Sequence, residues 1–220
     1  MKLNTNSNIY TFVYMTVVVI IVAVLLAVVS QALAPKQQAN ILLDKQKQIL
    51  GALKLDYSTG DPADIYMAHV NDTLRYGEQE VYVANINGAT KYILPLSGKG
   101  LWGGIGGYLA LDEDKNTIYG VNFNHESETP GLGAKIVEPE FRSQFEGKHI
   151  RNAAGDVVSV AVLKAGKHAE GQEQVDAISG ATITSSGVST MLEVNLAEYE
   201  EFLKVESNEG KEEDHVEPED

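Results

Sequence analysis

The sequence predicts an α+β protein with a single N-terminal transmembrane helix and one soluble domain, in which helices pack on a mainly antiparallel sheet. Three observations lead to this prediction. A long apolar run without charges lies near the N-terminus, short alternating segments typical of strands fill the middle, and an amphipathic segment typical of a helix lies near the C-terminus. With 220 residues and an atypical segment at each end, the chain has room for one core-forming domain.

The composition excludes several classes of protein. The formal net charge is -14 and no clustered basic face is visible, so we expect no nucleic acid among the partners. The chain contains no cysteine, which excludes disulfides, a thiolate nucleophile and cysteine-ligated zinc or iron–sulfur clusters. Any redox chemistry must therefore come from an organic cofactor.

The first 35 residues are expected to form a short cytoplasmic tail and a transmembrane helix. Residues 12–34 are almost wholly apolar and span roughly 35 Å as a helix, enough for a hydrocarbon core of about 30 Å. A cleaved signal peptide is the alternative, because Ala32-Leu33-Ala34 has the small-x-small form of a cleavage site. We expect the segment to be retained, because the run exceeds a signal-peptide core and Pro35 would directly follow the cut. Lysines on both sides of the span leave its orientation undecided by charge.

A helical stalk is expected at 36–56, since Pro35 can open a helix and a loose apolar stripe follows it. The next twenty residues are polar and turn-rich. The soluble domain is expected at 57–206, with strands at 80–87, 89–96, 107–111, 117–124 and 157–163. Asn87-Gly88 predicts a tight hairpin between the first two strands, and 112–116 is expected to be a turn.

Two helices are expected in the second half of the domain, a short one at 138–145 and a long one at 187–204. The long segment has an apolar stripe at three- and four-residue steps, which we expect to pack on the sheet. The stripe consists of Val188, Met191, Leu192, Asn195, Leu196, Tyr199, Phe202 and Leu203. Residues 207–220 are strongly acidic without apolar periodicity, so we expect a disordered tail.

The run from Asp176 to Gly187, which precedes the long helix, is rich in hydroxyl-bearing and small residues. Small residues let the backbone approach a ligand closely, and free amides at a helix start attract anions, so the run is typical of a phosphate cradle. The alternative is that Thr184, Ser185 or Ser186 simply caps the helix.

Residues 98–103 formally match the dinucleotide fingerprint G-x-G-x-x-G. A helix must follow that fingerprint directly, whereas further glycines and a strand-like segment follow here, so we expect no NADH site. The only tryptophan, Trp102, lies in this run. Taken alone, a single tryptophan is typical of a core position.

Residues 125–134 predict a bent loop, because Pro130 fixes one backbone angle while Gly131 and Gly133 free others. The loop amides and the Thr129 hydroxyl are suited to meet the polar edge of a flat ring. His125 and Glu128 lack further convergent ligands, so we interpret both as structural and assign no metal.

These segments together resemble a known family. The chain is similar to the FMN-binding domain shared by the C-type subunit of sodium-translocating NADH:quinone reductase and the G-type subunit of the related (Rnf-type) ferredoxin:NAD oxidoreductase complex. The similarity runs from the anchor to about Leu203, and the opening Asn8-Ile9-Tyr10-Thr11 is more similar to the quinone reductase protein. It rests on Leu101-Trp102-Gly103, Ile118 to Val121 with His125, Glu128 to Gly133, Phe141 to Lys148, and Asp176 to Thr182. Asp176 with Ser179-Gly180-Ala181-Thr182 meets every specified position of the family's flavinylation motif.

The resemblance implies FMN joined covalently to Thr182 through a phosphoester, with the phosphate near Ser179, Gly180 and Ala181. The flavin ring would lie by Trp102 and the loop Glu128, Thr129, Gly131, Leu132 and Gly133. It also implies an electron-transfer subunit without a complete active site of its own, in a bacterial inner membrane with its domain on the periplasmic side. The implied partners are the bilayer, other membrane subunits of the complex and a separate flavin transferase. The alternatives are the G-type subunit and, in a different class, a membrane-anchored module that binds a phosphate-bearing ligand without redox chemistry.

Overall fold

The computed structural model describes residues 8–164 and 166–204. The chain divides into two compact units, residues 1–45 and 46–220, which we describe separately. The predicted acidic tail at 207–220 lies outside the described residues.

Helix α1 (Asn8–Ala52) makes up the described part of the first unit and continues into the second. Its most apolar 18-residue window has a mean hydropathy of 3.1 and contains no buried residue. Within the described ranges, it is the one helix long and apolar enough to cross a membrane. The predicted anchor and stalk belong to one continuous helix, and Pro35, which could have been a first helical residue, lies inside it.

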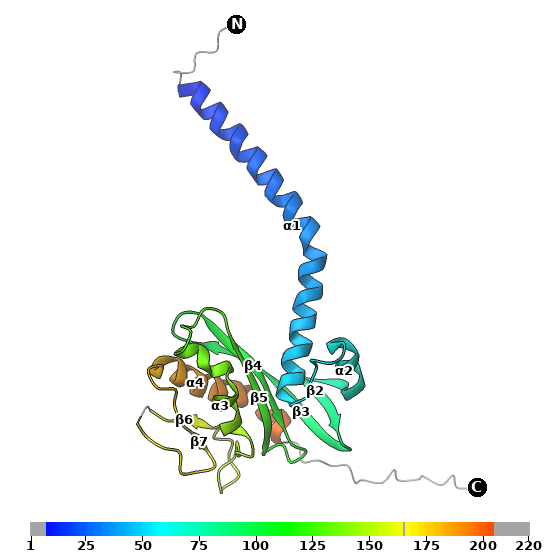
Figure 1. Ribbon diagram of the computed structural model, residues 1–220, viewed down its shortest axis with the longest axis vertical. Helices are drawn as coiled ribbons and strands as arrows, with labels where there is room; N and C mark the ends of the chain where they lie inside the picture. The colour runs from blue at the N-terminus through cyan, green and yellow to red at the C-terminus, as the bar shows by residue number, and fades with distance from the viewer. Residues whose placement is uncertain (1–7, 165, 205–220) are drawn as a thin grey trace, which may run out of the picture. The chain divides into compact units, whose positions relative to one another are not determined.

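The second unit is built on a five-stranded antiparallel sheet in the order β1-β2-β3-β4-β5 (Figure 1). The strands are β1 (Val70–Tyr76), β2 (Gln79–Ile86), β3 (Ala89–Lys99), β4 (Gly104–Leu111) and β5 (Ile118–His125). Asn87 and Gly88 both have positive φ angles, 55° and 87°, which confirms the predicted hairpin. Strand β1 and the preceding helix α2 (Pro62–His69) were not predicted, since this stretch was expected to be turns.

The helices follow the sheet in the chain. A 3-10 helix η1 (Gly133–Val137), helix α3 (Pro139–Arg142) and a second 3-10 helix η2 (Ser143–Phe145) form a short helical run, as predicted for 138–145. Helix α4 (Thr182–Glu198) starts five residues earlier than predicted and is followed by α5 (Glu200–Lys204). The strand predicted at 157–163 is wrong in extent, because only β6 (Ala161–Val162) forms and pairs in parallel with β7 (Gln174–Val175).

Each face of the sheet packs against its own hydrophobic cluster, because successive side chains of a strand point to opposite faces. Leu94 and Leu96 lie in the larger cluster with the apolar stripe of α4 and α5, which confirms that this stripe packs on the sheet. Tyr82 and Ile93 lie in the smaller cluster on the other face, against the last turn of α1. Burial on both faces explains why the middle strands are rich in apolar residues.

Asn195 is the one polar residue of the predicted stripe, and it has a specific role in this packing. Its side-chain oxygen accepts a hydrogen bond from the Ser97 amide, and its Nδ2 donates to the Ser97 and Met191 carbonyl oxygens, each at 2.9 Å. The side chain therefore pairs with the backbone of β3 as a neighbouring strand would, at a point beyond the residues that β3 pairs with β2.

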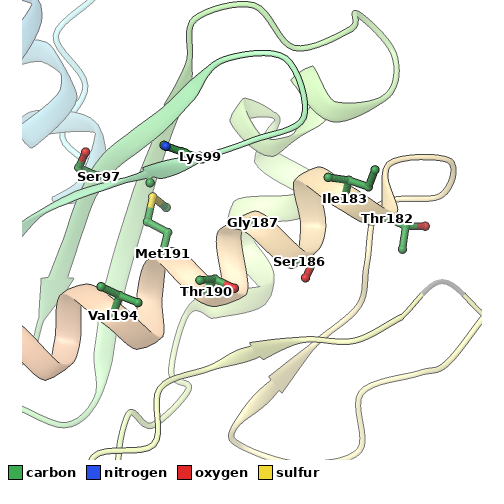
Figure 2. Close-up of a pocket in the computed structure, with 10 residues that line it drawn as sticks. Ser97, Lys99, Thr182, Ile183, Ser186, Gly187, Thr190, Met191 and Val194 are labelled. Carbon is green, nitrogen blue, oxygen red and sulfur yellow. The ribbon is translucent and has the colours of Figure 1, made fainter.

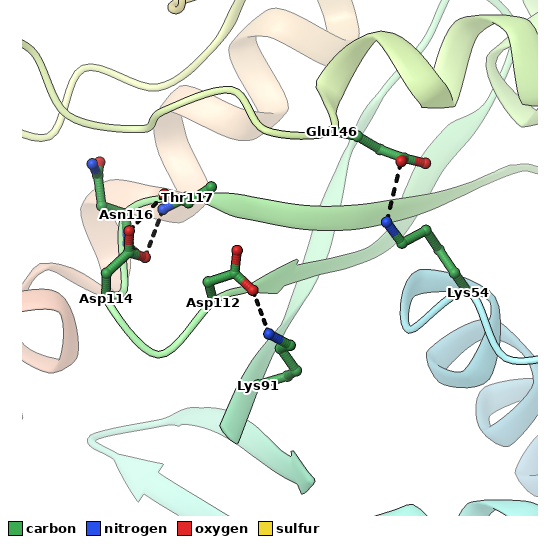
Figure 3. Close-up of polar contacts among 7 residues, drawn as sticks. All are labelled: Lys54, Lys91, Asp112, Asp114, Asn116, Thr117 and Glu146. Atoms are coloured by element: carbon green, nitrogen blue, oxygen red, sulfur yellow. Dashed lines mark hydrogen bonds and ion pairs between the residues drawn. The ribbon is translucent and has the colours of Figure 1, made fainter. Parts of the chain in front are cut away.

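Polar contacts fix the turn between β4 and β5 and the elements next to it (Figure 3). The Asp114 carboxylate accepts hydrogen bonds from the Asn116 and Thr117 amides and from the Thr117 hydroxyl, which confirms the turn predicted at 112–116. Partial burial raises the pKa of Asp114, but these hydrogen bonds outweigh it and lower the pKa below the usual value. The buried Lys91 forms an ion pair with Asp112 at 2.5 Å.

Candidate cofactor-binding site

The hydroxyl-rich run ends at the N-terminus of α4, where Thr182 is the first helical residue and is exposed. Ala181 occupies the N-cap position and makes no side-chain capping hydrogen bond, and Gly180 before it has a φ of 75°. The first amides of the helix therefore lack a capping side chain. Such a terminus attracts an anionic group.

The alternative of a simple capping role is wrong for Thr184 and Ser185. Both lie inside the first turn of α4 and are buried. The Thr184 hydroxyl donates to the Glu128 carboxylate at 2.6 Å, and the Ser185 hydroxyl accepts from the Ile178 amide at 3.2 Å. Their oxygens are therefore occupied, whereas the Thr182 side chain is exposed to solvent.

A groove of about 590 Å³ runs along α4 from Thr182, within the range typical of ligand pockets (Figure 2). Its lining combines hydroxyl-bearing residues of α4, apolar side chains and the last residues of β3. The lining residues are Ser97, Gly98, Lys99, Thr182, Ile183, Ser186, Gly187, Thr190, Met191 and Val194. Sequence analysis missed this surface, although Thr182, Ser186 and Thr190 recur at the four-residue spacing that places side chains on one helix face. Lys99 is the only charged residue of the lining.

The glycine-rich run 98–103 comprises the last two residues of β3 and the connection to β4 at 100–103. The strand β4 follows it directly in place of a helix, which confirms that the run is not a dinucleotide fingerprint. Trp102 is 67 % exposed, so the core position typical of a single tryptophan is wrong here. The Trp102 amide donates to Glu128 Oε1 at 2.9 Å, which ties this loop to the next one.

The loop after β5 approaches the run before α4. Thr129, Gly131 and Leu132 are exposed, whereas Gly133 is buried at the start of η1. A methyl group on Gly180 would lie 2.9 Å from Leu132 Cδ2, so the Leu132 side chain rests against the Gly180 backbone. Two of the predicted segments, about 50 residues apart in sequence, thus meet at the start of α4.

Asp176 and Ser179 are not among the residues that line the groove. The Asp176 carboxylate accepts from the Ala169 amide at 2.7 Å. This hydrogen bond, with the His168 side chain beside it, lowers the pKa of Asp176. Ser179 is exposed, two residues before the helix N-cap. The structure therefore gives Asp176 a role in fixing the loop before the motif.

Glu128 is the only buried acidic residue near these loops within the described part of the chain. Burial alone raises its pKa, but hydrogen bonds from the Thr184 hydroxyl and from the amides of 101–103 outweigh it and lower the pKa. The carboxylate is thus ionised at neutral pH. Among residues 8–164 and 166–204, no group of three or more metal-binding side chains converges, and the His125 Nδ1 accepts from the Glu128 amide at 3.3 Å.

Comparison with known proteins gives the family. The FMN-binding domain family matches residues 100–197, which include both loops and the start of α4. The C subunit of the Na⁺-translocating NADH-quinone reductase of Pseudomonas aeruginosa is 29% identical over 239 aligned positions, covering 86% of this chain and 91% of the relative. The C subunit of Chlamydia trachomatis is 36% identical over 140 positions, which span 44% of that relative.

Two solved structures share the fold. The crystal structure of NqrC from Shewanella oneidensis matches with a TM-score of 0.56 at 24% identity, covering 67% of this chain and 88% of that one. The crystal structure of the C subunit from Parabacteroides distasonis matches with a TM-score of 0.74 at 40% identity, covering 79% of this chain and 98% of that one. This chain belongs to the family formed by the C subunits of Na⁺-translocating NADH-quinone reductases.

Proposed function

We propose that this chain is the electron-transfer subunit of a Na⁺-translocating NADH-quinone reductase and carries FMN covalently on Thr182 through a phosphoester. The observation that carries this proposal is the position of Thr182. It is an exposed hydroxyl at the first residue of α4, beside uncapped helix amides and on the edge of a groove. The match to the FMN-binding domain family supports FMN as the cofactor.

The residues present fit this cofactor. Free amides at the start of a 17-residue helix suit a phosphate, and Gly180 leaves room for the backbone to approach it. Of the five hydroxyls in the run, those of Thr184 and Ser185 are buried and hydrogen-bonded, which leaves Ser179, Thr182 and Ser186 accessible. Only Thr182 combines exposure with a place in the first helical position.

FMN, when bound, accepts and donates electrons, while this chain's residues hold it and set its surroundings. The α4 amides and Gly180 would hold the phosphate. Trp102 and Leu132 would contact the ring, and two observations support this: both side chains are exposed, and Leu132 lies against Gly180. The linkage through Thr182 uses no atom of the ring system, so the cofactor stays attached in either redox state.

Several partners follow from the proposal. A separate flavin transferase makes the bond, as the resemblance implies, and within the described residues no group of three or more metal-binding side chains converges that could serve this chemistry. The apolar helix α1 crosses the bacterial inner membrane, with the domain on the periplasmic side and other subunits of the complex beside it.

Protease added to intact spheroplasts should then cleave the domain. Protection of the domain until the membrane is permeabilised would place it in the cytoplasm instead.

The G-type subunit remains the alternative within the family. The curated and solved relatives described above are all named as the C subunit, which favours a quinone reductase. Purification of the native complex followed by identification of its subunits separates the two.

The central test is Thr182→Val in the full chain, co-expressed with a flavin transferase. Valine is nearly isosteric but supplies no oxygen, so the protein should fold yet lose the fluorescent band on a denaturing gel and the added mass of one FMN less one water. Thr182→Ser should keep both. Thr190→Val is the matched control, because Thr190 lies on the same groove two turns along α4 and should leave the flavin in place. Covalent flavin on the Thr182→Val protein would refute the proposed attachment. A wild-type protein that binds flavin only reversibly would favour the non-redox module.

A further inference from the structure

We propose that Glu128 is a positioning residue whose carboxylate joins the Trp102 loop to the first turn of α4, and so holds the ring-contacting and attachment parts of the site in one arrangement. The proposal rests on the proposed function only for its effect on flavin. The tie itself is a property of the chain without cofactor.

Each carboxylate oxygen of Glu128 has its own partner. Oε1 accepts from the Trp102 amide at 2.9 Å, and Oε2 accepts from the Thr184 hydroxyl at 2.6 Å. These partners lie 26 residues before and 56 residues after Glu128 in the sequence. One side chain therefore connects three segments that the sequence keeps far apart.

The site around the carboxylate is built from glycine. A methyl group on Gly100 would lie 2.4 Å from Glu128 Oε1, and one on Gly133 would lie 2.3 Å from Oε2. Real carbon atoms do not approach so closely, so either side chain would displace the carboxylate. Two glycines from different loops thus leave a space that the carboxylate fills.

The Glu128 side chain is only 4% exposed and uses both oxygens within the protein. Charge-assisted hydrogen bonds of this kind are strong, and a buried carboxylate that loses one partner is left with an uncompensated desolvation cost. We therefore assign Glu128 an action through Trp102 and Thr184, and no direct contact with flavin. Thr184 follows Thr182 by two residues, so the tie also fixes the turn that carries the attachment hydroxyl.

The test uses the full chain with Glu128→Gln, Thr184→Val, the double variant and Thr184→Ser. Glu128→Gln keeps one acceptor oxygen but loses the charge and the second acceptor, so its side chain cannot accept from both the Trp102 amide and the Thr184 hydroxyl. The weaker tie should speed hydrogen exchange of the Trp102 amide by about tenfold, the factor that corresponds to about 1.4 kcal/mol. Thr184→Val should also speed it, because the carboxylate is no longer held from the other side. The double variant should exceed the larger single effect only slightly, whereas Thr184→Ser, which keeps the hydroxyl, should restore slow exchange.

A second readout uses Trp102 as the only tryptophan of the chain. Attachment of flavin should quench its emission less in Glu128→Gln and Thr184→Val than in the wild type or Thr184→Ser. The exchange measurement is repeated in protein produced without the flavin transferase, so it stands even if flavin is not attached at Thr182. Unchanged Trp102 exchange in both single variants, or fully additive effects in the double variant, would overturn the proposal. If Glu128→Gln does not fold, the Thr184→Val and Thr184→Ser pair decides the question by the same measurements.

Discussion

Asn195→Ala should lower the free energy of unfolding of the domain, because the Asn195 side chain joins α4 to the backbone of β3. The substitution removes three hydrogen bonds of 2.9 Å, two with the Ser97 backbone and one with the Met191 carbonyl. At about 1 kcal/mol net for each, the loss is about 3 kcal/mol. Water can reach the exposed Ser97, and alanine favours helix by about 0.6 kcal/mol, so we expect a net loss of about 2 kcal/mol in the free energy of unfolding.

The measurement is urea unfolding of the full chain in detergent, followed by near-ultraviolet circular dichroism. With a denaturant dependence of about 2 kcal/mol per M, the midpoint should fall by about 1 M. Val194→Ala is the matched control, because Val194 is the exposed neighbour on the same helix and its truncation should cost no more than about 0.5 kcal/mol. Asn195→Asp should cost more than Asn195→Ala, because a carboxylate would face two carbonyl oxygens. Equal midpoints for Asn195→Ala and Val194→Ala would refute the role we give to this side chain.

Three further predictions concern the sheet and the site. Gly107→Ala should destabilise by about 3 kcal/mol or more in the same urea assay, because φ is 150° and the new methyl group would lie 2.0 Å from the Asn122 carbonyl oxygen; an unchanged midpoint would contradict this. Trp102→Phe should leave covalent flavin attached but raise the flavin fluorescence, since indole quenches flavin more than phenyl does. Equal flavin emission in the two proteins would show that Trp102 does not contact the ring. Because the pKa of Glu128 is lowered in the folded state, its carboxylate stabilises the domain above the unfolded-state pKa of about 4.3, and this contribution is lost as the pH falls through the folded value. Urea midpoints measured between pH 7 and pH 3 should therefore converge for wild type and Glu128→Gln at the acid end, and a constant gap would disprove the linkage.

The parts of the fold that the sequence predicts are those with strong local signals. Asn87-Gly88 determines its hairpin because both residues accept positive φ, and the stripe of α4 follows helical spacing. Strand β1 was missed because it lies at the sheet edge and carries exposed polar residues, so it lacks the apolar alternation of the inner strands. Helix α4 was predicted to start late, because Gly187 and the preceding hydroxyl residues have low helix propensity.

The candidate site also has parts that the sequence predicts and parts that it does not. The motif at 176–182 and the loops near Trp102 and Leu132 are recognisable by their residues, and the structure brings Leu132 against Gly180. The groove and the Glu128 tie depend on contacts between segments that are far apart in the sequence, such as Glu128 with Trp102, 26 residues away, and with Thr184, 56 residues away. No local pattern encodes such a pair. Sequence reasoning therefore assigned Glu128 a structural role from its neighbours and, from the family resemblance, a place by the flavin ring, but it indicated neither of its hydrogen-bond partners.

Gly187 has a tight position inside α4, since a methyl group there would lie 2.4 Å from the Lys99 carbonyl oxygen. At this point of the helix only glycine can face the Lys99 carbonyl group, which restricts the rotation of the helix about its axis. Thr182 precedes Gly187 by five residues, which at about 100° per residue places its hydroxyl about 140° around the helix from the glycine. The five-residue spacing between Thr182 and Gly187 therefore determines the direction in which the Thr182 hydroxyl points from the helix axis. One residue inserted between Thr182 and Gly187 would turn the hydroxyl by about 100° around the helix axis, although residues 176–182 themselves would be unchanged.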